Sequence, residues 1–324
     1  LKGLKLELDL KTGALETDIK SLKKAARQTV GPELKKRIQI IVKTGLLEIK
    51  DDFKIYWEKF PIATLSAGKN YLNPDIILIV DDILENNHRQ KLSEFLDKWI
   101  KEKINIVLKS LIDLKNLKDS NSSIKALAYQ LYESNGVIKR EQVSAYLKKL
   151  GQDERKILRD LGVKFGRYHV FLFRLFKPEA VSLRILLWKN YHQKYFTLTP
   201  PTFGLNFLED KNFNNKSFML LCGFENFDQY FVRIDILERL FVLIINANPD
   251  KKKEIKLIPE MLNLLGCSKD NFKKLILKMK YKSYEKDNEI YFQYNPTKEK
   301  IKKVIKKTYI KDSPFKVLKN INFN

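Results

Sequence analysis

Apolar residues recur at helical spacing along most of the chain. The longest stripe runs through 87–117, where leucines, isoleucines and aromatic residues return every three or four positions for several turns. Shorter stripes, bounded by glycine, proline or clusters of serine and asparagine, predict further helices over 17–29, 33–43, 124–134, 140–150, 153–161 and 179–190. The first two thirds of the chain is therefore expected to be largely helical.

Two stretches depart from the helical pattern. Phe53, Ile55 and Trp57 alternate with polar neighbours, which predicts a strand, and prolines and a glycine punctuate the residues that follow. We therefore expect a small β-rich insert over 51–80. Residues 195–232 are rich in Pro, Asn and Phe without a clear period, and they are predicted to form an irregular connector.

Residues 233–297 have the clearest local architecture. Helical stripes predict helices over 233–246, 258–265 and from Ser268, which is a typical N-cap residue. Alternation on both sides of a polar turn at 285–288 predicts a hairpin. Three helices followed by a hairpin is the order of elements in a winged helix. The expected fold class is therefore mainly α, multi-helical, with a small β-rich insert and a C-terminal winged-helix-like domain.

The same patterns divide the chain into five segments. They are a helical segment with the β-rich insert (1–86), a helical accessory domain (87–194), the irregular connector (195–232), the winged-helix-like domain (233–297) and a basic tail (298–324).

The net charge of the chain indicates what kind of partner it binds. Lys and Arg number 62 against 39 Asp and Glu, which gives a net charge of +23 and favours a polyanionic partner, RNA or DNA. From residue 251 onward, 20 lysines face 8 acidic residues. A chain rich in Lys, Asn and Ile also arises from the codon usage of an A/T-rich genome. The charge alone therefore does not distinguish nucleic-acid binding from codon bias.

Motifs of catalysis are missing from the sequence. There is no G-x-x-x-x-G-K-[ST] or G-x-G-x-x-G phosphate loop, and the three histidines lack metal-ligand spacing. Cys222 and Cys267 are expected to be thiols of a reducing compartment. No signal peptide and no apolar run of 18 residues occurs, so we expect a cytoplasmic location without membrane contact. No catalytic residue, metal or cofactor is expected in this chain, and its start at Leu1 indicates a missing upstream part.

Binding chemistry remains, and it concentrates in GVKFGRYHVFLFRLF (162–176). Guanidinium groups beside aromatic rings can hold phosphates while Phe165, Tyr168 or Phe171 stacks on bases. The alternative is that the phenylalanines belong to the core and the arginines only face solvent. The candidate nucleic-acid-binding residues come from this segment and from the third helix and hairpin of 233–297: Lys164, Arg167, Tyr168, His169, Arg174, Lys269, Lys273, Lys274, Lys278, Lys282 and Lys286.

The longer stretch LRDLGVKFGRYHVFLFRLFKPEAVSLRILLW (158–188) contains a G-V-[RK]-F-G-x-[YF]-H pattern, a hydrophobic run and a Lys-Pro helix start. In this it resembles the C-terminal region of alphaproteobacterial superfamily-2 helicases, relatives of the RNA helicase of the mitochondrial degradosome. The matching residues are Gly162, Val163, Lys164, Phe165, Gly166, Arg167, Tyr168, His169, Lys177 and Pro178. Further similar segments, in the family's order, are 95–104, 124–143, 232–240, 264–272 and 312–318. The match is weakest over 195–220, and lysine replaces much of the family's arginine.

The resemblance implies an ATP-dependent helicase whose ATPase lobes lie upstream, with ATP and Mg²⁺ bound by that motor and not by this chain. This region would then guide RNA or DNA, as a single strand or a tailed duplex, through the motor. Two alternatives stay open. One is a winged-helix DNA-binding regulator, which is less favoured because lysine contacts phosphates and does not read base edges. The other is a scaffold that docks a nuclease or a ribosome.

Overall fold

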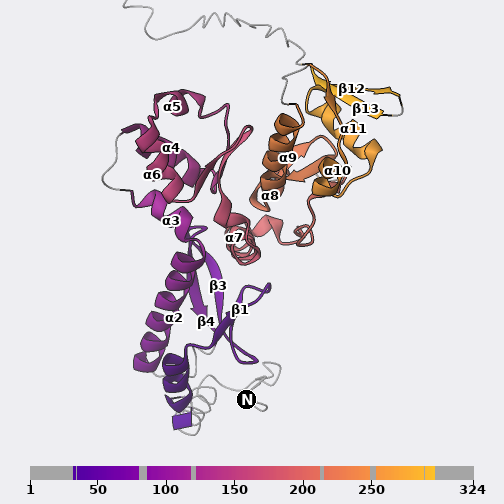
Figure 1. The fold of residues 1–324 in the computed structure, drawn as a ribbon. Helices are drawn as coiled ribbons and strands as arrows, with labels where there is room; N and C mark the ends of the chain where they lie inside the picture. Colours follow the sequence, from indigo (N-terminus) through magenta and orange to yellow (C-terminus); the bar gives the residue numbers. More distant parts are fainter. Residues whose placement is uncertain are drawn as a thin grey trace, which may run out of the picture.

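The computed structural model describes residues 32–33, 35–79, 86–117, 122–211, 215–248, 253–287 and 289–295. These residues form a narrow arm and two lobes that lie side by side at one end of the arm (Figure 1). The helix predicted over 17–29 and the basic tail at 298–324 lie outside the described residues.

The arm combines a four-stranded antiparallel sheet with a long helix. The sheet has the order β1-β2-β3-β4, with strands at Leu47–Ile49, Lys54–Trp57, Phe60–Asn70 and Asn73–Leu78. Helix α2 (Asn86–Val107) packs on β4 and buries residues four apart on one face: Leu92, Leu96, Ile100 and Ile104. The β-rich insert is confirmed. The single helix expected over 87–117 is wrong, because the chain leaves helical geometry at Leu108 before α3 (Lys109–Lys115) begins.

The first lobe continues from the arm. Its helices are α3, α4 (Ser122–Glu133), α5 (Ser144–Lys149) and α6 (Gln152–Asp160). They pack on a sheet of order β5-β7-β6, with strands at Val137–Lys139, His169–Leu172 and Val163–Phe165 respectively. One apolar core runs from Ile38 in the arm through this lobe to Leu187. The arm and the first lobe therefore share a single core.

Helix α7 (Pro178–Tyr191) lies where the arm and both lobes meet (Figure 1). It follows a 3₁₀ turn, η1 (Phe173–Phe176), and starts at Pro178, which suits the first helical turn. Its fully buried Arg184 donates to the carbonyl oxygens of Asn135 (3.0 Å) and Leu175 (2.8 Å). Burial lowers the pKa of Arg184 to about 10, so the guanidinium stays charged at neutral pH. On the arm side, Asn190 Nδ2 donates to Ser66 O at 2.9 Å.

The second lobe contains two three-stranded antiparallel sheets, of order β8-β10-β9 and β11-β13-β12. It follows a second 3₁₀ turn, η2 (Gln193–Tyr195). In chain order its elements are β8 (Phe207–Glu209), α8 (Lys216–Leu221), β9 (Phe224–Phe227), β10 (Tyr230–Arg233), α9 (Ile234–Asn246), β11 (Ile255–Lys256), α10 (Pro259–Leu265), α11 (Lys269–Lys278), β12 (Tyr281–Lys286) and β13 (Glu289–Tyr294).

The expected mainly-α fold class is wrong. About 51% of the described residues are helical and about 24% lie in strands, which form four small antiparallel sheets. Strands as short as β5, β6 and β8 show too little alternation to be recognised in the sequence. The stretch 195–232, expected to be irregular, holds β8, α8, β9 and β10.

The winged-helix-like assignment of 233–297 is likewise not retained. Helices and a hairpin are present there, but they do not close a core of their own. Tyr230 and Val232 of β10 are buried in the same cluster as Phe272 and Phe292, so the preceding sheet is part of this unit. None of the helices in the described ranges has both the length and the apolar composition that crossing a membrane requires.

Candidate nucleic-acid interface

Within the segment 162–176, β6 and β7 form a β-hairpin that is followed by η1, and the tip of the hairpin faces the second lobe. We call Gly166, Arg167, Tyr168 and His169 the GRYH turn. The turn is closed by Gly166 N–H donating to His169 O at 2.8 Å. Arg140 fixes it from the first lobe, since its Nη1 donates to Gly166 O (2.7 Å) and its N–H donates to Tyr168 O (2.8 Å).

The carboxylate of Glu238 holds the GRYH turn from the second lobe. Glu238 lies in the second turn of α9 and accepts the backbone N–H groups of Arg167, Tyr168 (2.9 Å) and His169 (2.8 Å). Successive backbone N–H groups that converge in this way form a concave site for an anion. Each hydrogen bond to a charged group contributes about 1.5–3 kcal/mol. The contact therefore joins the two lobes at the hairpin tip.

Gly166 is required by this contact. A Cβ at position 166 would lie only 2.3–2.7 Å from the carboxylate atoms of Glu238. Any other residue would push the turn and the carboxylate apart.

His169 is buried between two carboxylates and is only 2% exposed. Its Nε2 lies 2.7 Å from Glu225 Oε2 and its Nδ1 lies 3.4 Å from Glu238 Oε1, a long distance for a hydrogen bond. Burial alone lowers the pKa of His169, but the hydrogen bonds and charges of the two glutamates outweigh burial and raise that pKa. Burial raises the pKa of Glu225, whereas His169 and Lys139 (Nζ to Oε1, 2.9 Å) outweigh it and lower that pKa.

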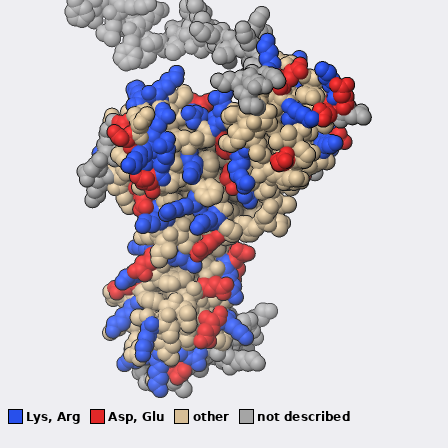
Figure 2. Space-filling view, viewed as in Figure 1, with Lys and Arg blue, Asp and Glu red and all other residues tan. Residues whose placement is uncertain are grey.

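Two hollows lie next to the GRYH turn, and both are lined by Arg167, Tyr168 and Tyr294. We call them together the interlobe groove. The lysine hollow, of about 270 Å³, is also lined by three lysines: Lys139, Lys278 and Lys280. The aromatic hollow, of about 720 Å³, is also lined by residues that include Phe241, Lys253, Tyr281 and Gln293. Figure 2 shows Lys and Arg gathered over the first lobe and at its junction with the second.

Arg167 and Tyr168 are positioned by aromatic contacts. The Arg167 guanidinium lies 5.4 Å from the centroid of the Phe241 ring, and the Tyr168 ring packs edge-on against Phe241 at 5.5 Å. Burial and the hydrogen bond to Tyr281 raise the pKa of Tyr168, so its hydroxyl stays protonated. Arg167 is exposed and forms no ion pair within the part of the chain that the structure describes. Its charge is therefore available to a ligand in the groove.

The structure brings together only some of the predicted site residues. Those that line the groove are Arg167, Tyr168, His169 and Lys278. His169 is not available to a ligand, because its ring is buried between two glutamates. Lys278 pairs with Asp228 at 2.7 Å, but an exposed pair of this kind is weak and a phosphate can compete for the lysine.

The other predicted residues lie outside both hollows. Lys164 and Arg174 are exposed on the first-lobe hairpin and on η1. Lys273 pairs with Glu285, while the remaining lysines are exposed on α11 and β12: Lys269, Lys274, Lys282 and Lys286. Of the three aromatic residues expected to stack on bases, Phe171 is buried and Phe165 packs on the first core, so only Tyr168 reaches the groove.

Several groove residues were not predicted from the sequence. Tyr294 is 55% exposed at the end of β13, where the strand runs past the core that buries Ile290 and Phe292. Lys280 follows α11 with φ of 68°, a left-handed conformation that is uncommon outside glycine and that places it in the lysine hollow. Glu238 is separated from the GRYH turn by about 70 residues, so no local sequence pattern predicts that the two are in contact.

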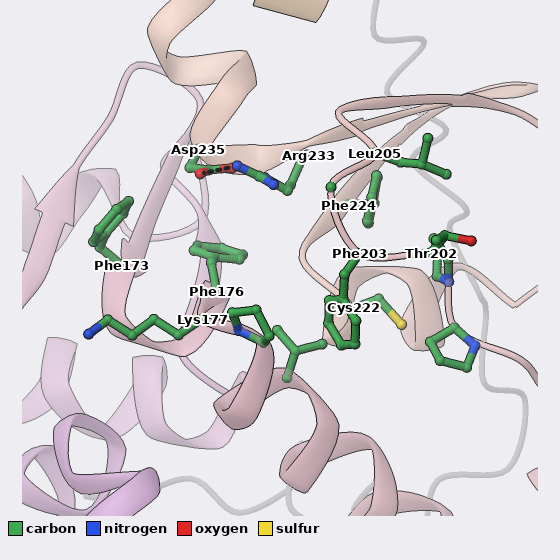
Figure 3. A pocket seen from close by; sticks show the side chains of 15 residues that line it. Phe173, Phe176, Lys177, Thr202, Phe203, Leu205, Cys222, Phe224, Arg233 and Asp235 are labelled. Carbon is green, nitrogen blue, oxygen red and sulfur yellow. Dashed lines mark hydrogen bonds and ion pairs between the residues drawn. The ribbon is translucent and has the colours of Figure 1, made fainter. Parts of the chain in front are cut away.

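A further pocket, of about 290 Å³, lies between the start of α7 and residues 200–205 (Figure 3). Its lining is mainly apolar and includes Phe176, Phe203 and Phe224. Of its cations, Arg233 is held by Asp235 at 2.7 Å and Lys177 stands at the rim. The pocket offers less positive charge to phosphates than the interlobe groove does. Phe203 is exposed at this pocket.

No protein-family model, no curated protein and no solved structure matches the chain.

The steric role of Gly166 predicts a specific coupling. Gly166→Ala should lower the free energy of unfolding by about 1–3 kcal/mol, the usual effect of overpacking a filled site. In a Glu238→Ala background the added methyl has room, so the same substitution should cost much less. A double-mutant cycle measured by urea unfolding checks this. Equal costs in both backgrounds would contradict the contact.

The charged cluster at His169 predicts a pH dependence of stability. The pKa of His169 is higher in the folded protein than its ordinary value of 6.5. The protonated imidazolium therefore stabilises the fold fully below pH 6.5, and this stabilisation is lost as the pH rises through the folded-state pKa. The urea midpoint should therefore fall as pH rises above about 6.5, and His169→Gln should flatten that fall. His88→Gln, in the arm, is the control and should keep the wild-type profile. A His169→Gln profile as steep as the wild type would count against the cluster.

Proposed function

We propose that this chain is the nucleic-acid-binding accessory region of an ATP-dependent, RNA-directed helicase, and that it guides a single strand for a motor outside this chain. The observation that carries the proposal is the interlobe groove. In it Arg167, Lys278 and Lys280 lie beside the exposed ring of Tyr294.

Cations and an exposed aromatic ring in one groove favour a single strand over a duplex. Proteins that bind single strands combine a positive groove for the backbone with aromatic rings on which bases stack. Bases in a duplex are already stacked on one another and cannot lie on Tyr294. The cations contact phosphates and carry little sequence information, which suits a helicase that moves along any sequence.

The family resemblance supports the same proposal. The stretch 158–188 that carries it runs from the end of α6 through the β6–β7 hairpin and η1 into α7. It therefore supplies both the GRYH turn of the groove and the helix at which the arm and the lobes meet. In such a helicase ATP and Mg²⁺ belong to the motor, and the residues of this chain act by holding the strand.

Binding should be tested by fluorescence anisotropy of the full chain with labelled single-stranded RNA, single-stranded DNA and duplex over a salt series. We expect the strongest binding to single-stranded RNA and a steep loss of affinity as salt rises. Arg167→Gln should weaken binding about tenfold and reduce the salt slope by about 1, because it removes one phosphate contact. Lys101→Gln, which removes one exposed charge from α2 in the arm, is the matched control and should change neither.

Lys280→Gly is a second variant that separates binding from folding. Glycine relieves the left-handed strain at position 280, so stability should not fall, while the loss of a groove cation should weaken binding. Weak binding of the wild-type chain to all three nucleic acids at physiological salt would contradict the proposal. That outcome would favour the protein-docking scaffold.

A further inference from the structure

The two hollows of the interlobe groove differ in chemistry. The lysine hollow carries three lysines and two carboxylates. Glu225 is held by Lys139 and His169, Glu141 is exposed, and Lys278 forms an exposed pair with Asp228, so the hollow keeps a surplus of cations. The aromatic hollow carries four aromatic side chains and two amides, with Arg167 and Lys253 as its cations. Arg167, Tyr168 and Tyr294 line both hollows and therefore stand between them.

We propose that the aromatic hollow binds one nucleobase turned out of the strand, while the phosphates on either side of that base lie along the lysine hollow. The proposal rests on the proposed function and deepens it. It assigns a ligand, a single unstacked base, to a defined cavity, and it predicts that part of the affinity comes from bases and not from charge.

The size of the aromatic hollow fits this ligand. Its volume of about 720 Å³ lies within the range of about 300–1,000 Å³ that is typical of pockets for small ligands. One base with its ribose can enter it, whereas a base pair flanked by its neighbours is held in its own stack. The hollow therefore selects a strand whose bases are free to turn out.

Tyr294 supplies a fixed stacking surface. It pairs in register with Tyr281 at the open end of the β12–β13 hairpin, and the two rings meet edge to face at 5.2 Å. Tyr281 is buried and packs edge-on against the buried Phe292 ring at 5.7 Å, so the ring behind Tyr294 is held in place. Tyr294 itself stays 55% exposed. A base can stack on it without displacing any of these contacts.

The remaining lining suits the edge and the backbone of a nucleotide. The amide of Gln293 offers both a donor and an acceptor to a base edge. Arg167 lies at the boundary with the lysine hollow, where the phosphate of the turned-out nucleotide would pass, and Arg pairs well with phosphate.

The test compares a uridine RNA 12-mer with an abasic RNA 12-mer, which keeps the sugar and phosphates but has no bases. Using a fully abasic strand removes base stacking in every binding register. We expect the full wild-type chain to prefer the base-carrying strand by at least about fivefold, the lower end of what one stacked base contributes. Tyr294→Ala should lose this preference while binding the abasic strand as the wild type does. Tyr294→Phe should retain it.

Phe203→Ala is the matched control, because Phe203 is 54% exposed and lines the other, apolar pocket. It should keep the full preference. If the wild type binds both strands equally well, the base pocket is overturned and the proposed function stands. If the preference survives in Tyr294→Ala, the base stacks elsewhere and the assignment is overturned. If the wild type binds neither strand, the proposed function itself fails.

Discussion

The carboxylate of Glu238, held by three consecutive backbone N–H groups of the GRYH turn, is the contact on which the groove depends. It joins a hairpin of the first lobe to a helix of the second. The same turn places Arg167 and Tyr168 along the groove, where both line its two hollows. The two glutamates around His169 extend this contact into a buried cluster in which each charge has a partner.

The groove is supported from behind by α7. The helix is buried on most of its surface, and Arg184 is its one fully buried cation among the described residues. Arg184 has no carboxylate partner there. Its Nη1 and Nη2 donate to carbonyl oxygens at the turn after α4 and at η1, while its buried Nε has no hydrogen-bond partner among the described residues. A guanidinium can bridge two such oxygens, whereas an ammonium is a compact point charge. The exposed pairs of α11, by contrast, add little rigidity, which leaves their lysines open to a ligand.

Sequence patterns located most helices but not the tertiary contacts that make the site. The start of α7 at Pro178 and the helices of the second lobe follow from proline, serine and apolar spacing, which are local signals. Short strands such as β5 and β8 cannot be predicted from the sequence, because three residues are too few to show an alternating pattern. The unusual composition of 162–176 is visible in the sequence, but the burial of His169 is not, since only the fold reveals its two glutamates. Tyr294 was missed because its exposure depends on where β13 leaves the core.

A single strand bound in the interlobe groove would lie against Tyr294 and the GRYH turn. Photocrosslinking tests this most directly: the full chain is irradiated with a single-stranded RNA that carries 4-thiouridine, and the crosslinked peptides are identified by mass spectrometry. We expect crosslinks at Tyr294 and within the GRYH turn. Crosslinks confined to the lysine face of α11 and β12, or to the arm, would contradict it.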